Sequence, residues 1–245
     1  MGGCCSGCQV SRLSHTAYAN LTPPTPLGPT LSPRTLSSTG QLAYFDMKLK
    51  AITVAAEAGD EAEVTRLLAA GDNPNGGTRN GHEWPPLVFA ARNGHATVVD
   101  MLLAAGARPN KADLNGLTPL ATAADNGHVR VVDSLLRAGA ETDLAPKRFH
   151  PLDRDTPLVI AAARGHGTVI DRLIEAGADT NLATSLGFTP LSVAAAKGHG
   201  KVVASLIEAG ADSNLETVHD RTPLIRAVEY EHADIVQVSP VSMIR

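Results

Sequence analysis

The chain has 245 residues, of which 43% are hydrophobic but only 3% aromatic, and its formal net charge is −4. The core must therefore be built from Ala, Val, Leu and Ile side chains, which suit thin, closely spaced elements. No apolar run approaches the roughly 18 residues of a membrane span. No basic stripe of the kind that binds nucleic acid is present either. We therefore expect a soluble body with no nucleic-acid partner.

The first 45 residues differ from the rest. They contain no Asp or Glu, two Arg, twelve Ser or Thr, and five prolines between residues 23 and 33. Such a composition cannot bury enough apolar surface to order itself. The sequence predicts a disordered N-terminal tail over 1–45, followed by one folded domain over 46–245.

The N-terminus begins MGGCCSGC and holds all three cysteines of the chain. Gly2 follows the initiator methionine, and Ser6 completes the M-G-x-x-x-[ST] myristoylation pattern. Cys4 and Cys5 lie beside it, where palmitoyl transfer is expected. One myristoyl chain binds membrane marginally, whereas two acyl chains anchor stably. We expect lipidation at Gly2, Cys4 and Cys5, which would hold a cytoplasmic protein against a membrane by a flexible leash.

Two other interpretations of the tail stay open. An acid-free segment containing Ser and Arg is also typical of an organellar transit peptide. The pair Cys5-x-x-Cys8 resembles half of a zinc or redox site, but no second Cys pair or nearby His completes it. A secreted disulfide framework is excluded because the cysteines are confined to one end.

After the tail, one block recurs with a period near 33 residues. Similar segments cover 84–110, 117–143, 155–181 and 188–214, with a looser copy at 49–75 and a damaged one from Arg221 onward. A period of this size indicates a solenoid in which each unit buries its apolar face against its neighbours.

Each block predicts two short helices. A threonine in N-cap position precedes a proline at the first helical position, at Thr118, Thr156, Thr189 and Thr222. The first helix is Ala-rich and should end at Gly94, Gly127, Gly165 or Gly198. The second carries apolar residues at helical spacing and should stop at Gly106, Gly139, Gly177 or Gly210.

The elements T-P-L, A-A-x-x-G-H and L-L/I-x-A-G-A-D-x-N resemble ankyrin repeats over residues 48–245. This resemblance implies an all-α solenoid of helix-turn-helix units joined by hairpin connectors. Its six repeats would span 48–82, 83–115, 116–153, 154–186, 187–219 and an incomplete 220–245. The His that commonly follows T-P-L in the family is replaced by Val88, Ala121, Val159, Ser192 or Ile225.

The resemblance also implies where partners dock, namely the connector tips and the concave face of the first helices. The corresponding helix-end residues are Arg92, Asn93, Asp125, Asn126, Arg164 and Lys197. The corresponding tip residues include Leu114, Asn115, Leu186, His219 and Arg221. Leu117 and Phe188 also lie at the tips, and either exposure to a partner or packing under a neighbouring connector is compatible with the pattern.

Two connectors are longer than the others. The connector at 76–84 holds Arg79 and the single Trp84, and the one at 145–155 holds Lys147, Arg148, Phe149 and His150. Insertions in repeat arrays map to loops, often on the binding face, and aromatic and Arg residues dominate interface energies. These residues are therefore predicted to bind a partner. A tolerated surface insertion is the alternative.

The recurrent histidines could suggest a metal site, but their spacing argues against one. His95, His128, His166, His199 and His232 hold one position in successive units, about 8–10 Å apart, whereas zinc needs its ligands about 2 Å from one ion. We expect them to hydrogen-bond backbone at the turn between paired helices. No catalytic motif is present. The prediction is a monomeric, cofactor-free scaffold or adaptor protein rather than an enzyme, with a regulatory subunit as the alternative.

The last block matches the repeat pattern at its start but departs from it at residue 239. Alignment with the previous copy places Ser239 and Pro240 at the positions of two helical residues, and a proline inside a helix costs about 3 kcal/mol. We expect a frayed final repeat in a truncated or alternatively ended chain.

Overall fold

The computed structural model describes residues 51–76, 78–79, 82–83, 85–145, 155–217, 221–232 and 235, with 78–79 and 82–83 described by their backbone alone. All of them belong to the unit Leu42–Arg245. The predicted tail at 1–45 and the final residues 236–245, including Ser239 and Pro240, lie outside the described residues.

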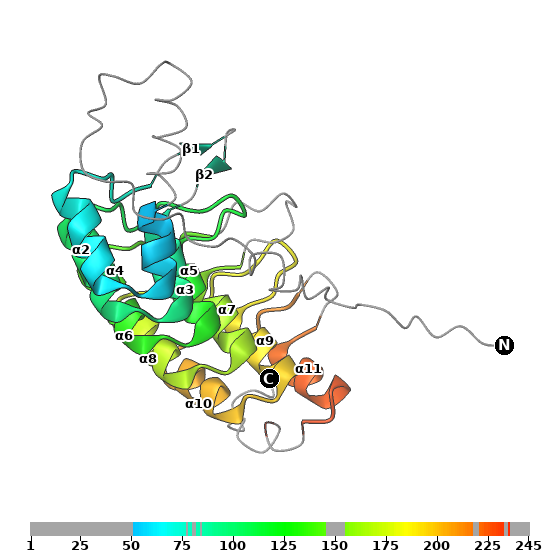
Figure 1. Ribbon diagram of the computed structural model, residues 1–245. Coiled ribbons are helices and arrows are strands. Elements are labelled where there is room, and N and C mark those ends of the chain that lie inside the picture. The colour runs from blue at the N-terminus through cyan, green and yellow to red at the C-terminus, as the bar shows by residue number, and fades with distance from the viewer. Residues whose placement is uncertain are drawn as a thin grey trace. The chain divides into compact units, whose positions relative to one another are not determined.

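The described part is a stack of helix pairs, which confirms the predicted all-α architecture (Figure 1). The first helices form one layer, made of residues 51–58, α3 (Pro86–Asn93), α5 (Pro119–Asn126), α7 (Pro157–Arg164), α9 (Pro190–Lys197) and α11 (Pro223–Glu229). The second helices form the other layer, made of α2 (Glu61–Ala69), α4 (Ala96–Ala104), α6 (Val129–Arg137), α8 (Gly167–Glu175) and α10 (Gly200–Glu208). From α3 to α10, each first helix packs against the second helix of its own unit, and equivalent helices of adjacent units pack in sequence from α3 to α11 and from α2 to α10.

The helix starts form as predicted. The hydroxyl of Thr118 accepts a hydrogen bond from the backbone N–H of Ala121 at 3.1 Å, and Thr156 caps α7 by accepting from Val159 at 3.3 Å. Thr189 and Thr222 do the same for α9 and α11. Such a bond satisfies one of the N–H groups that a helix start leaves without an intrahelical partner, and a cap of this kind is typically worth about 1 kcal/mol.

The core lies between the two layers and is aliphatic. Alanines of the first helices, such as Ala123 and Ala161, are fully buried against Leu and Val residues of the second helices. Leu135 and Leu173 are also fully buried at equivalent positions of α6 and α8. Small side chains let neighbouring helices approach closely, which is how a chain with so few aromatics still packs a continuous core.

The recurrent histidines join neighbouring units. Nε2 of His128 donates to the carbonyl of Arg92 at 3.0 Å, and Nε2 of His199 donates to the carbonyl of Ala163 at 3.3 Å. Because a carbonyl only accepts, Nε2 carries the proton in these rings. His95, His166 and His232 make the same contact. The predicted backbone hydrogen bonds are confirmed, and the acceptor in each case belongs to the preceding unit.

A second set of bonds joins the units at the connectors. The amide oxygen of Asn181 accepts from the backbone N–H of Asp212 at 2.7 Å, 31 residues along the chain. Asn75 and Asn110 bind the next unit in the same way. Between the third and fourth units the acceptor is the Asp143 carboxylate, which takes the N–H of Asp179 at 3.2 and 3.3 Å. At each of these four joints, a side chain of one unit accepts from the backbone of the next.

One connector contains a short hairpin. β1 (Thr78–Arg79) and β2 (His82–Glu83) pair antiparallel, with Thr78 opposite Glu83 and Arg79 opposite His82. This connector, at 76–84, is one of the two longer connectors identified in the sequence. Arg79 lies on its first strand. Within the described chain, no helix has both the length and the apolar character needed to cross a membrane.

Candidate functional site

A groove of about 570 Å³ opens beside the first helices, and we call it the groove throughout. Four consecutive units contribute to it, from α3 to α9, together with the connector ends that lead into the helices. Of the residues predicted to bind a partner, five line it: Arg92, Asp125, Asn126, Arg164 and Lys197. They come together because each holds one of the last two positions of a first helix, and stacking sets those positions side by side.

An ion pair crosses the groove between two units. Nε of Arg164 at the end of α7 lies 2.7 Å from Oδ1 of Asp125 on α5. The Asp125 carbonyl also accepts the ring N–H of His166 at 3.2 Å. Asp125 is therefore held through both its backbone and its side chain, and the pair neutralises one cation and one anion of the groove.

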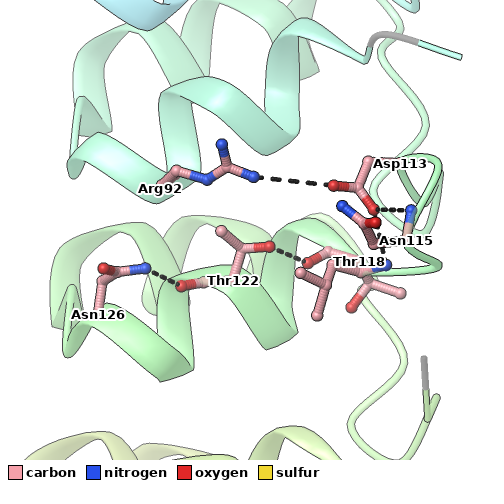
Figure 2. A network of polar contacts seen from close by, with 7 residues as sticks. Arg92, Asp113, Asn115, Thr118, Thr122 and Asn126 are labelled. Atoms are coloured by element: carbon pink, nitrogen blue, oxygen red, sulfur yellow. Dashed lines mark hydrogen bonds and ion pairs between the residues drawn. The ribbon is translucent and has the colours of Figure 1, made fainter. Parts of the chain in front are cut away.

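Asp113, in the connector before α5, pairs with Arg92 of the groove lining (Figure 2). Its Oδ1 accepts the backbone N–H groups of Asn115 and Leu117, both at 2.9 Å. Its Oδ2 faces a guanidinium nitrogen of Arg92 at 3.7 Å, and only 7% of the Asp113 side chain is exposed. The connector is thereby tied to the preceding first helix, and Arg92 is drawn toward it.

Helix α5 presents its own polar row to the groove (Figure 2). The Thr122 hydroxyl donates to the Thr118 carbonyl at 2.9 Å, and Nδ2 of Asn126 donates to the Thr122 carbonyl at 2.8 Å. The Asn126 side chain is consequently oriented along its own helix, with its amide oxygen left for other contacts.

The remaining described candidates lie away from the groove lining. Nδ2 of Asn93 donates to the Glu57 carbonyl at 2.7 Å, so this side chain helps to join two units. Leu114 and Asn115 are exposed at a connector, and Leu186 is half-buried in another. Nε of Arg221 pairs with Glu229 at 2.6 Å.

The other predicted binding and lipidation residues lie wholly or partly outside the described part of the chain. Arg79 is described by its backbone in β1 only. Outside the described residues lie the candidates of the two longer connectors and of the last one, namely Trp84, Lys147, Arg148, Phe149, His150 and His219. The lipidation candidates Gly2, Cys4 and Cys5 lie outside them too.

The apolar part of the groove was not predicted as a site. Leu117 and Phe188, whose position the sequence left open, are half-buried and line it. Ile160 on α7 and Val193 on α9 are also half-buried there. Ile160 and Val193 are 33 residues apart, at the same place in successive first helices. A search for apolar residues recurring on the less buried side of these helices would have found them.

The row formed by Ile160 and Val193 continues on α11 as Arg226. Its guanidinium carbon lies 4.7 Å from the centre of the Phe188 ring and 5.7 Å from that of Tyr230. Cations over aromatic faces are attracted by the ring quadrupole. Phe188 therefore contacts Arg226 and also lines the groove.

The second-helix layer shows a different charge arrangement. Arg172 on α8 lies 3.4 Å from Asp133 and donates to Glu175 at 2.8 Å. The hydrogen bond to Glu175, aided by the charges of Glu175 and Asp133, raises the pKa of Arg172. Within the described ranges, no three His, Cys, Asp or Glu side chains gather in a way that could hold a metal ion.

No curated protein matches the chain. A family model described as ankyrin repeats (3 copies) matches residues 52–146 and 158–238, which together cover most of the chain and nearly all of the described helices. The match agrees with the observed helix pairs, their threonine caps and their sequential stacking. The chain belongs to the ankyrin repeat family.

Proposed function

We propose that this chain is a non-enzymatic scaffold or adaptor whose protein partner docks in the groove. Ankyrin repeats are generally protein–protein interaction modules. The observation that carries the proposal is the groove itself, where half-buried Ile160, Val193 and Phe188 lie between charged helix ends. Apolar side chains gathered at one place and rimmed by polar groups are typical of a protein-binding surface.

The contacts around the groove support a preformed site. Asp113 is held by two backbone N–H groups, and Asp125 is held by Arg164 and His166. A partner meeting such a surface has few side chains to order, so less of its binding energy is lost to conformational entropy.

Photo-crosslinking at two matched lysines tests this proposal. Lys197 lies at the end of α9 in the groove, whereas Lys201 is exposed on α10 in the other layer. With a photoreactive residue at position 197 in the full chain, we expect protein adducts in cells at least about fivefold more abundant than from position 201. Equal labelling from both positions, measured by mass spectrometry of the adducts, would count against docking in the groove.

We further propose that the chain is tethered to a membrane by acylation at Gly2, Cys4 and Cys5. Support comes from the sequence, where the M-G-x-x-x-S pattern is followed at once by two adjacent cysteines. A single myristoyl chain gives an association constant on the order of 10⁴ M⁻¹, so palmitoylation of a cysteine is needed for stable anchoring.

The Gly2→Ala variant tests the tether. It should move the protein from the membrane fraction to the cytosolic fraction, and intact-mass spectrometry of the wild type should show loss of Met1 and gain of a myristoyl mass. Gly3→Ala is the matched control and should fractionate as the wild type does. A mature N-terminus well inside the tail, beyond Cys5, would instead support the transit-peptide alternative and exclude the tether.

A further inference from the structure

The groove contains a cation without a counter-charge. Arg164 reaches back from the last position of α7 to Asp125 in the preceding unit at 2.7 Å. Lys197 holds the equivalent position on α9, but the residue that corresponds to Asp125 in the preceding unit is Ala163. Among the described residues, Lys197 accordingly has no carboxylate to pair with.

A second cation lies beside the same apolar surface. Arg226 contacts the Phe188 and Tyr230 rings, and its buried Nε has no hydrogen-bond partner among the described residues. The acid closest to it in sequence, Glu229, pairs with Arg221 at 2.6 Å. Among the described residues, no carboxylate pairs with Arg226, so its guanidinium can form a charge-assisted bond with an incoming carboxylate.

Lys197 and Arg226 flank an apolar surface. Phe188 lines the groove together with Lys197 and also lies under the Arg226 guanidinium, and Ile160 and Val193 line the groove as well. An occupant that satisfies both features needs carboxylates on either side of an apolar side chain. Of the cations that line the groove, Arg92 is paired with Asp113 and Arg164 with Asp125, which leaves Lys197 as the lining cation with no carboxylate partner among the described residues.

The groove is long enough to hold an extended segment. The groove spans four first helices, α3 to α9. Neighbouring packed helices are about 8–10 Å apart, so three steps cover about 24–30 Å. An extended chain rises about 3.3 Å per residue, so about eight residues span this length.

We propose that the partner is recognised through an extended acidic peptide segment with an apolar anchor. The anchor packs on Ile160, Val193 and Phe188, and flanking carboxylates bind Lys197 and Arg226. This inference rests on the proposed docking of a protein in the groove and specifies the chemistry of its occupant.

Selection of peptides on the purified full chain tests the proposal. Random 12-residue peptides are displayed and selected, and fluorescent copies of the enriched sequences are titrated by anisotropy. We expect the enriched peptides to carry net negative charge and at least one large apolar residue. Their dissociation constants should rise about tenfold for Lys197→Glu and severalfold for Arg226→Gln. Higher salt should weaken binding, because exposed charges are screened.

Two controls keep the outcomes distinct. Lys201→Glu makes the same charge change on α10 and should leave affinity within about twofold, because it lies off the groove. Ile160→Arg blocks the groove and should abolish binding. Circular dichroism melts identify any variant that fails to fold, and Lys197 is exposed enough for its reversal to be tolerated.

The proposal fails if the enriched peptides are uncharged or basic, or if Lys197→Glu binds them as well as Lys201→Glu does. In those cases, sensitivity to Ile160→Arg would keep the groove as a docking site, whereas insensitivity would remove that function too. Binding of phosphatidylserine vesicles through Lys197, with no peptide binding, would assign these cations to a membrane and also overturn the inference.

Discussion

Leu135→Ala is expected to lower the free energy of unfolding by about 2–5 kcal/mol, the range found for buried Leu→Ala changes. Leu135 is fully buried in the last turn of α6, in the middle of the stack. Its removal leaves a cavity between units that can relax little, because the helices on both sides are fixed by their own neighbours. Urea denaturation followed by circular dichroism measures the loss.

Leu136→Ala is the matched control for this prediction. Leu136 is the next residue of the same helix and is only half-buried, so its truncation should cost clearly less. Because stability in a repeat array depends on neighbour interfaces, the Leu135→Ala transition should also broaden as the two halves of the stack uncouple. Equal losses for the two variants would contradict the assigned core.

Gly165→Ala is expected to destabilise the chain by about 2–3 kcal/mol, through two separate effects. Gly165 ends α7 with φ of +78°, a conformation that costs a residue with a Cβ about 1–2 kcal/mol. An added Cβ would also lie 2.8 Å from Nδ1 of His199. The ring must then move and lose its 3.3 Å bond to the Ala163 carbonyl, worth about 1 kcal/mol.

Gly177→Ala separates these effects. Gly177 has φ of +89°, and nothing lies within 4 Å of the Cβ it would gain. Its replacement should therefore cost the backbone penalty alone, measured by the same denaturation. In a double-mutant cycle, Gly165→Ala and His199→Ala should be less than additive, because removing the ring removes the clash. Full additivity would show that the close contact with His199 does not contribute.

Much of the fold follows from the sequence because the local signals agree with one another. A threonine followed by proline starts a helix, a glycine with positive φ ends it, and the 33-residue period requires stacking. The helix-end part of the groove followed as well, since Arg164 and Lys197 hold equivalent positions in successive units. Repetition makes equivalent positions neighbours in space.

Other parts of the groove depend on how neighbouring units pack, which the pattern within one repeat does not show. The hydrophobic pattern of α7 does not say that Ile160 stays half-buried while its neighbour Val159 is buried. The Arg164–Asp125 pair joins positions that differ by one place within their helices, so it depends on the lateral offset between units. The sequence left open whether Phe188 is exposed or packed. Its surroundings depend on Arg226, one unit further on, whose guanidinium lies over the Phe188 ring.

The histidine joints have a consequence for how such a protein can change over time. Each ring binds a backbone carbonyl, and the residues that supply it are Glu57, Arg92, Asp125, Ala163 and Ala196. These side chains range from the charged Glu, Arg and Asp to Ala, yet the joint is the same, since every residue has a carbonyl. Three of them, Arg92, Asp125 and Ala163, also line the groove. Substitutions at these positions can therefore change the lining of the groove while leaving the hydrogen bond between repeats intact, so the chemistry of the groove and the stability of the stack can change separately.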